Sequence, residues 1–298
     1  MESLEKNLNR AILETVARFD IFNFPLTSLE IWQWLDLKVS FEEIIKNLDK
    51  SLLEKKQGFY FLPGREEIII TRQERYREAE KKIKIAQKRL KLISWLPNIK
   101  FIALANIIGP HNLKEETDLD LFIVTKTNRL WLVKFLATII LKLTNLRPTE
   151  RNSKNKLCLS FLVDESALNL ANCRLDNNDW YFTYWLTGLR PLYGDLEIFK
   201  KLLIANSWLE KALPNWQLNP YQPINNFYKK ITNNKTFKAK NLLEIISHKL
   251  HQLLMAKDLK NLQNKNTAVI ITDHVLKLHT LDRRPDFFKL AKEKLTNL

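Results

Sequence analysis

The sequence predicts an α+β fold with a small N-terminal domain, a mixed-sheet core and a helical C-terminal region. Three patterns carry this prediction: apolar residues at helical spacing over residues 4–19, two apolar strand patterns around a polar loop at residues 111–117, and amphipathic helical patterns after residue 176. The chain has 298 residues, about twice the length of an average domain, so we expect several domains. Their expected bounds are residues 1–70, 71–98, 99–175 and 176–298.

The N-terminal domain is predicted to contain three helices and a β-hairpin. The first helix covers residues 4–19, and Ser/Thr-x-x-Glu capping boxes at Thr27 and Ser40 predict the starts of two shorter helices. Residues 58–71 are interpreted as a β-hairpin with Gly64 at its tip. Three helices followed by a hairpin resemble a winged helix.

A winged helix often reads DNA with its third helix, but the charges of this segment argue against that role. The predicted third helix, residues 40–52, carries three acidic residues against two lysines, so it would repel the duplex. Only the predicted wing, with Lys55, Lys56 and Arg65, attracts phosphate. A structural or partner-binding role is therefore favoured over direct DNA reading, and a DNA-binding regulator is the least favoured hypothesis.

The predicted helix of residues 71–98 links two domains and is strongly basic. The formal net charge of the whole chain is +15, which favours polyanionic partners such as nucleic acid or nucleotides. Residues 71–100 contribute ten basic residues against three acidic ones, and residues 222–265 add a second excess. The basic helix is interpreted either as a solvated face or as a strip that faces phosphates. The side chains concerned are Arg72, Arg75, Lys81, Lys82, Lys88 and Arg89.

The composition predicts a cytoplasmic protein with no membrane partner. The longest apolar run is shorter than the ~20 residues that a spanning helix needs, and no secretory leader pattern is present. Two cysteines indicate reduced thiols. Cys158 lies in the apolar run of residues 157–163 and is interpreted as a small buried hydrophobic side chain rather than a nucleophile.

The predicted core contains an acidic pair at the start of its second strand. Asp118 and Asp120 stand two residues apart, so both side chains project from one face of the strand. Two carboxylates this close repel each other unless a cation lies between them, and Mg²⁺ is the natural partner of such oxygen ligands. The pair therefore suits metal-assisted phosphoryl chemistry. The pattern around it predicts strands at residues 100–105, 118–124 and 157–163 and a helix at residues 128–143.

Four segments together resemble a known family: KEETDLDLFIVTKTNRLWLVKFL, KLCLSFLVDESAL, LTGLRPLYGD and ARFDIFNFPLTSLEIWQWL. They are similar to a bacterial group of the nucleotidyltransferase superfamily, with a polymerase-beta-like fold, that joins a winged helix to a nucleotidyltransferase domain. The resemblance implies that Asp118 and Asp120 are catalytic residues that bind Mg²⁺ and a nucleoside triphosphate. It also implies a third carboxylate on a later strand, which helps activate the acceptor hydroxyl.

The chain departs from this family pattern at two places. The family spacing places Asn106 where a Gly-Ser motif grips the triphosphate. Gly109 is an alternative backbone donor, but the proline after it offers neither a hydroxyl nor an N–H. The third predicted strand carries Ser160 in place of a carboxylate. Arg190 is a further candidate phosphate contact, so the candidate nucleotide-binding residues are Asn106, Gly109 and Arg190.

Two functions remain open. The first is a Mg²⁺-dependent nucleotidyltransferase that moves a nucleoside monophosphate from a triphosphate to an unknown acceptor, such as nucleic acid or protein. The alternative is a non-catalytic nucleotide- or nucleic-acid-binding protein on the same fold. A hydrolase is disfavoured, because His274 beside Asp273 lacks an activated Ser or Cys motif.

Overall fold

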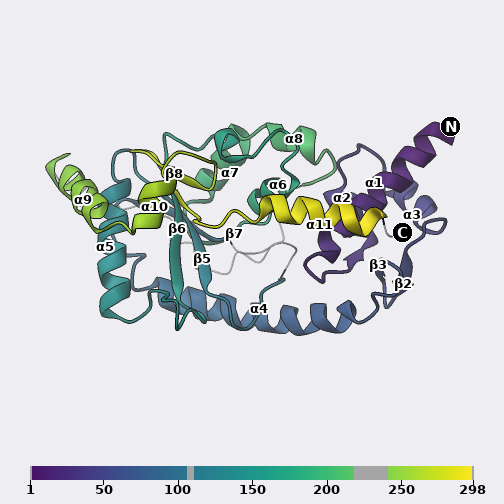
Figure 1. The fold of residues 1–298 in the computed structure, drawn as a ribbon, viewed down its shortest axis with the longest axis horizontal. Helices are drawn as coiled ribbons and strands as arrows, with labels where there is room; N and C mark the ends of the chain where they lie inside the picture. The colour runs from purple at the N-terminus through teal and green to yellow at the C-terminus, as the bar shows by residue number, and fades with distance from the viewer. Residues whose placement is uncertain (1, 106–110, 218–240, 297–298) are drawn as a thin grey trace.

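The computed structural model describes residues 2–105, 111–217 and 241–296, which form an α+β protein with two sheets (Figure 1). The N-terminal part of the chain contains three helices and a three-stranded sheet in the order β1-β3-β2. Both predicted capping boxes are present, at Thr27 and Ser40. The elements are α1 (Glu2–Asp20), β1 (Leu26–Thr27), α2 (Ser28–Trp34), α3 (Phe41–Leu48), β2 (Glu54–Lys56) and β3 (Phe59–Phe61).

The hairpin tip predicted at Gly64 is wrong. The turn between β2 and β3 is made by Gln57 and Gly58, which have φ of 53° and 81°. Positive φ at both central residues is what a two-residue hairpin turn needs to match the twist of its strands. The segment that was predicted as the second strand instead begins a helix, because Ile68 and Ile69 are buried against Phe61.

The basic linking helix is α4 (Ile68–Leu90), which runs from the N-terminal domain along the large sheet (Figure 1). Several of its cations contact the protein rather than solvent. Arg72 pairs with Glu30 at 2.8 Å, and Lys82 donates to the Thr117 carbonyl at 2.6 Å. Arg75 and Arg89 also donate to backbone carbonyls. Four of the six cations are therefore not part of a strip that faces phosphates. Their contacts connect α4 to the N-terminal domain and to the loops beside the large sheet.

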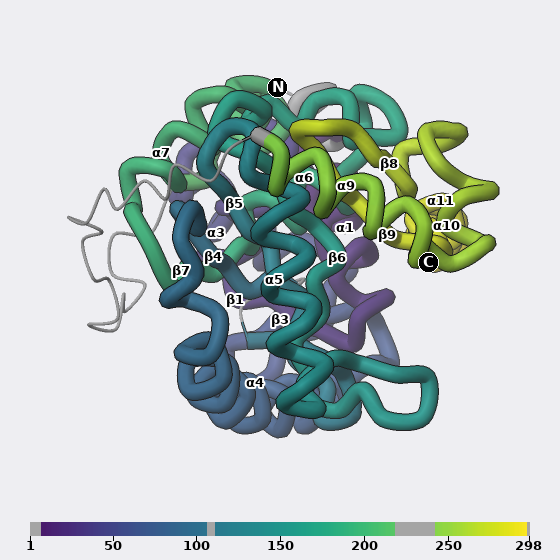
Figure 2. Tube along the Cα trace, turned by 90° about the vertical axis from the view of Figure 1, so that its left-hand side faces the viewer, coloured from purple at the N-terminus to yellow at the C-terminus, as the bar shows by residue number. Residues whose placement is uncertain are grey.

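The large sheet has six strands in the order β7-β4-β5-β6-β9-β8, and β5 and β6 are its parallel pair. Helices α4 and α5 cover one face and α6, α7 and α8 cover the other, while α9 lies beside α5 (Figure 2). The strands are β4 (Ile99–Leu104), β5 (Leu119–Thr125), β6 (Leu157–Asp164), β7 (Arg190–Gly194), β8 (Val269–Ile271) and β9 (Val275–Leu278). The helices are α5 (Leu130–Leu143), the 3₁₀ turn η1 (Ala171–Cys173), α6 (Trp180–Thr187), α7 (Leu196–Ala205), α8 (Trp208–Ala212), α9 (Asn241–Leu254), α10 (Lys257–Leu262) and α11 (Arg284–Thr296).

The expectation that residues 176–298 are a helical region, separate from a core that ends at residue 175, misses three strands. β7 and the β8–β9 hairpin complete both edges of the large sheet. These strands are three to five residues long, too short to show a period in the sequence. Pro191 is tolerated in β7 because this strand lies at the sheet edge.

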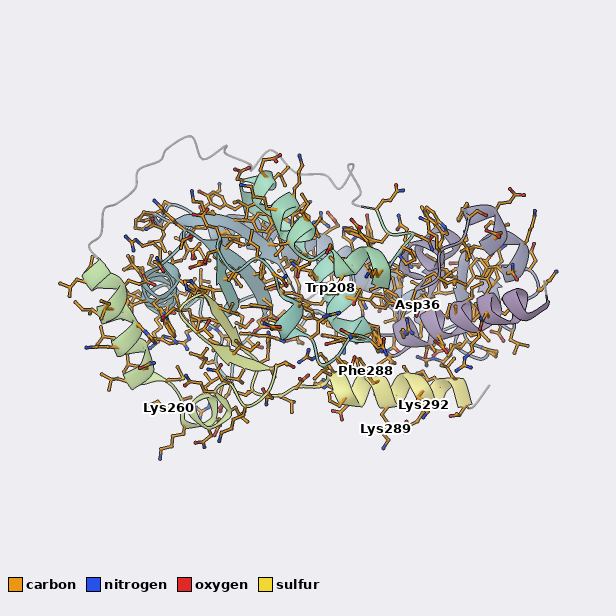
Figure 3. All side chains as sticks on the ribbon, turned by 90° about the horizontal axis from the view of Figure 1, so that it is seen from above. Asp36, Trp208, Lys260, Phe288, Lys289 and Lys292 are labelled. Carbon is orange, nitrogen blue, oxygen red and sulfur yellow. The ribbon has the colours of Figure 1, made fainter. Side chains whose placement is uncertain are left out.

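Aromatic side chains of α6 and α11 pack against the N-terminal domain. Tyr184 of α6 stacks on Phe19 of α1, with ring centroids 5.0 Å apart. Figure 3 shows Phe288 of α11 near Asp36 and Trp208, which line the same cavity, while Lys289 and Lys292 are exposed on α11. None of the helices in the described ranges combines the length and the apolar character that crossing a bilayer requires.

Candidate metal centre

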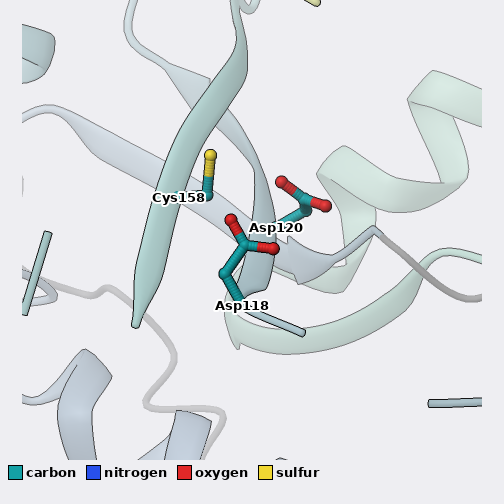
Figure 4. A group of neighbouring side chains, drawn as sticks. All are labelled: Asp118, Asp120 and Cys158. Atoms are coloured by element: carbon teal, nitrogen blue, oxygen red, sulfur yellow. The ribbon is translucent and has the colours of Figure 1, made fainter. Parts of the chain in front are cut away.

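The predicted acidic pair lies at the start of β5, on one face of the sheet. Along β5 the alternating side chains Leu119, Leu121 and Ile123 pack in the core beneath α4 and α5. Asp118, Asp120 and Phe122 therefore project from the opposite face, where Phe122 packs with α6. Figure 4 shows both carboxylates pointing into the same space, as the i, i+2 spacing predicts.

Cys158 joins this pair from the neighbouring strand. β6 runs parallel to β5 with Cys158 opposite Asp120. One oxygen of each carboxylate and the Cys158 sulfur all lie within 4.8 Å of one another (Figure 4). The interpretation of Cys158 as a small buried hydrophobic side chain is correct only in part, because this cysteine is half-buried and its sulfur faces two carboxylates rather than an apolar core.

A bulge in β6 brings a second polar side chain to the pair. Asp120 is opposite Cys158 but Phe122 is opposite Phe161, so β6 contains one extra residue between these positions. The hydroxyl of Ser160 consequently donates to Asp120 Oδ1 at 3.2 Å. Cys158 and Ser160 thus occupy the side of the site from which the family resemblance implies a third carboxylate.

The two carboxylates are electrostatically unfavourable together. Burial and then the charge of Asp118 raise the pKa of Asp120 to about 6. Burial also raises the pKa of Asp118, and hydrogen bonds with its own backbone and with the Cys158 thiol, followed by the Lys82 ammonium, offset part of this shift. A divalent cation between the carboxylates would remove the repulsion, which is the usual reason for such a pair.

The pair opens into a cavity of about 400 Å³ between the sheet, α6 and the start of α11. Tyr181 forms one wall by stacking on Phe287 at 5.1 Å. Burial and then the Asp120 charge raise the pKa of Tyr181 to about 12. The cavity therefore has a negative end and an aromatic wall. Its other lining residues include Phe161, Phe182, Trp185, Lys277, His279, Asp282, Arg283 and Arg284.

The three cations of this cavity differ in what they contact. Arg284 is buried and paired with Asp179 at 2.8 Å and Asp282 at 2.6 Å. Lys277 donates to the Thr267 carbonyl at 2.7 Å and is also buried. Arg283 is exposed at the rim, with its guanidinium carbon 5.3 Å from the Phe287 ring centre. Arg283 is therefore the cavity cation best placed to meet an incoming anion, and the sequence analysis did not single it out.

Of the three predicted nucleotide-binding residues, the structure describes one, Arg190, and this residue does not join the site. Asn106 and Gly109 lie outside the described residues. Arg190 is opposite Leu104 on the face that α4 covers, where it donates to His111 Nε2 at 2.6 Å and lies 3.8 Å from Glu80. Since Asp120 projects from the other face, the assignment of Arg190 to the phosphate site is not supported.

The carboxylate at the far end of β6 does not supply a third ligand either. Asp164 accepts from the Asn128 backbone N–H at 3.0 Å and contacts His274 Nδ1 at 2.7 Å. His274 therefore pairs with Asp164 rather than with the neighbouring Asp273 that the sequence suggested. In the part of the chain that the structure describes, Cys158 is the one further His, Cys, Asp or Glu ligand grouped with Asp118 and Asp120.

Comparison of this chain with known proteins finds no match among protein-family models, curated proteins or solved structures.

Proposed function

We propose that this protein is a divalent-metal-dependent nucleotidyltransferase that moves a nucleoside monophosphate from a nucleoside triphosphate to an acceptor hydroxyl of nucleic acid or protein. The observation that carries the proposal is the pair Asp118 and Asp120, held side by side at the mouth of a cavity. The resemblance of the surrounding segments to the nucleotidyltransferase superfamily supports the same chemistry.

The two carboxylates fit the ion that this reaction uses. Mg²⁺ is commonly held in proteins by one or two carboxylates, with water and substrate phosphate completing its shell. Asp118 and Asp120 supply the carboxylates, and the cavity leaves space for phosphate oxygens. When bound, the ion neutralises charge on the phosphates and on the leaving group.

The other residues of the cavity position the substrate. The exposed Arg283 guanidinium is suited to bind the triphosphate in place of the missing Gly-Ser motif. The wall formed by Tyr181 and Phe287 offers apolar surface to a base. Phosphoryl transfer requires little covalent chemistry from the protein, so positioning and charge stabilisation can supply most of the rate.

One observation favours the alternative function, a nucleotide-binding protein without turnover. Cys158 and Ser160 face Asp120 where the superfamily is expected to have its third carboxylate. Without that carboxylate, activation of the acceptor hydroxyl is weakened while nucleotide binding is not.

The decisive experiment measures nucleotide binding and nucleotide transfer separately. Each labelled nucleoside triphosphate is incubated with the full chain and candidate acceptors, with and without Mg²⁺. We expect metal-dependent binding that Asp120→Asn weakens at least about 100-fold, because it removes one ligand charge. Asp273→Asn, which changes an exposed aspartate on the β8–β9 turn, is the matched control.

The outcomes separate the two functions. Label transferred to an acceptor supports the enzyme, whereas metal-dependent binding without transfer supports the non-catalytic protein. Equal nucleotide affinity for Asp120→Asn and for the unmodified protein would refute both.

A further inference from the structure

The candidate metal centre contains one donor that does not suit Mg²⁺. Mg²⁺ binds oxygen ligands, whereas thiolates select softer ions such as Zn²⁺. Yet the sulfur of Cys158 lies within 4.8 Å of one carboxylate oxygen of Asp118 and one of Asp120. The donor set of this chain thus differs from the all-oxygen set that the family resemblance implies.

We propose that Cys158 is a metal ligand, and that the centre formed by Asp118, Asp120 and Cys158 takes a divalent transition-metal ion of the Zn²⁺ type in preference to Mg²⁺. This inference deepens the proposed function, and rests on it in placing the cation between the same two aspartates. It assigns a ligand and a class of metal that the family resemblance does not imply.

The distances permit coordination with small side-chain adjustments. Zn²⁺ binds sulfur at about 2.3 Å and carboxylate oxygen at about 2.0–2.2 Å in a tetrahedral arrangement, so two ligands of one ion lie about 3.4–3.6 Å apart, and side-chain rotations that close each gap by about 1 Å suffice here. The three donor atoms already lie within 4.8 Å of one another. Cys158 and Asp120 occupy paired positions on two adjacent strands, so the backbone holds two of the three ligands in register.

The number of ligands matches a reactive rather than a structural centre. Structural zinc sites close with four protein ligands, whereas catalytic ones use three and leave a position for water or substrate. Here three protein ligands meet, and both carboxylates line the cavity of about 400 Å³. A phosphate oxygen entering this cavity can occupy the remaining position.

The surroundings of Cys158 support its role as a positioned ligand. The hydroxyl of Ser160 donates to Asp120 at 3.2 Å and orients that carboxylate, as groups behind metal ligands usually do. The buried ammonium of Lys134 donates to the Leu159 carbonyl within the β6 bulge. Burial and then the charges of Asp120 and Asp118 raise the pKa of the Cys158 thiol, and the Lys134 ammonium offsets part of this shift, so a bound cation is what would stabilise the thiolate.

Metal binding at this centre is a simple exchange of a proton for an ion. The Cys158 thiol loses its proton to the buffer and the sulfur forms a bond with the metal, without any oxidation. The two carboxylates bind in their ionised form.

The test uses Co²⁺ as a coloured substitute for Zn²⁺, because a thiolate bound to Co²⁺ gives a charge-transfer absorption band. The full chain, Cys158→Ser and Cys173→Ser are titrated with Co²⁺, and Zn²⁺ affinity is measured by competition with a chromogenic chelator. We expect the band in the unmodified chain and in Cys173→Ser, because Cys173 is a buried cysteine outside the centre. Cys158→Ser should lose the band and bind Zn²⁺ at least about tenfold more weakly.

A second measurement uses the unmodified chain, so its result does not depend on whether the Cys158→Ser variant folds. Alkylation of Cys158, followed by mass spectrometry, should be slowed by Zn²⁺ but not by the same concentration of Mg²⁺. Absence of the Co²⁺ band in the unmodified chain, equal Zn²⁺ affinity for Cys158→Ser, or equal alkylation with and without Zn²⁺ would each overturn the inference.

The inference and the proposed function fail in different ways. If Mg²⁺ supports nucleotide transfer and Cys158→Ser changes neither transfer nor metal affinity, the function stands and the inference is wrong. If the Co²⁺ band appears but no nucleoside triphosphate binds, the metal centre stands and the proposed function is wrong.

Discussion

Two charged clusters line the same cavity, and they differ in how their charges are balanced. The first cluster, Asp118, Asp120 and Cys158, brings two carboxylates together, and burial and then the charge of Asp118 raise the pKa of Asp120 to about 6. In the second cluster, buried Arg284 pairs with Asp179 and Asp282 and also donates to the Cys173 carbonyl at 3.0 Å. The second cluster is neutralised within the protein, whereas the first keeps two carboxylates side by side, an arrangement that a bound divalent cation would stabilise.

This difference distinguishes a structural cluster from a functional one. A buried ion pair with its hydrogen bonds satisfied holds elements in place, here the start of α11 against α6. Perturbed acids in a cavity are typical of a site that binds or reacts. The clusters should therefore respond in opposite ways to substitution.

The largest expected effect is on folding, from removal of the cation of the second cluster. Arg284→Met leaves Asp179 buried without its partner, so we expect the free energy of unfolding to fall by about 3–5 kcal/mol. Urea unfolding measures this change. Arg283→Met is the matched control, because its side chain is exposed, and it should change stability by less than about 0.5 kcal/mol. Equal losses in the two variants would contradict the comparison.

A smaller effect concerns pH, through the buried Lys277 between the two clusters. Burial and then the charge of Arg284 lower the pKa of Lys277 to about 8. Below that pH Lys277 is charged in both the folded and the unfolded state, so burial of its charge lowers the free energy of unfolding by a constant amount. Between about pH 8 and 10 the folded state releases this proton before the unfolded state does, so the free energy of unfolding rises relative to Lys277→Met, by up to about 1.4 kcal/mol per pH unit. Parallel pH profiles for the two proteins would show that Lys277 keeps an ordinary pKa.

The smallest expected effect is on nucleotide affinity, at the exposed cation of the cavity rim. Arg283→Ala should weaken binding of a nucleoside triphosphate about tenfold, or about 1.4 kcal/mol, because a solvated guanidinium–phosphate contact is lost. Metal affinity should not change. Lys289→Ala, an exposed cation further along α11 (Figure 3), is the control and should bind as the unmodified protein does. Unchanged affinity in Arg283→Ala would remove this residue from the site.

Sequence reasoning succeeded where the chemistry is local. The capping boxes at Thr27 and Ser40 begin helices as predicted, because each box is completed within four residues. The acidic pair shares one face of β5 because side chains alternate along any strand. It failed at Gly64, where the turn residues that matter were Gln57 and Gly58, with positive φ. A signal for Cys158 was present, since Cys158 and Ser160 interrupt an apolar strand with the same two-residue spacing as the aspartates.

By itself, the sequence determined the helices of the N-terminal domain, the acidic pair and its common face, because these depend on backbone geometry over a few residues. Only the tertiary structure decided that Cys158 meets Asp120, that Arg190 turns to the opposite face and that the cations of α4 contact backbone carbonyls. These arrangements depend on which strands become neighbours, in what register and with what bulge. Such choices are made by the packing of residues 35 or more positions apart, and no local pattern encodes them.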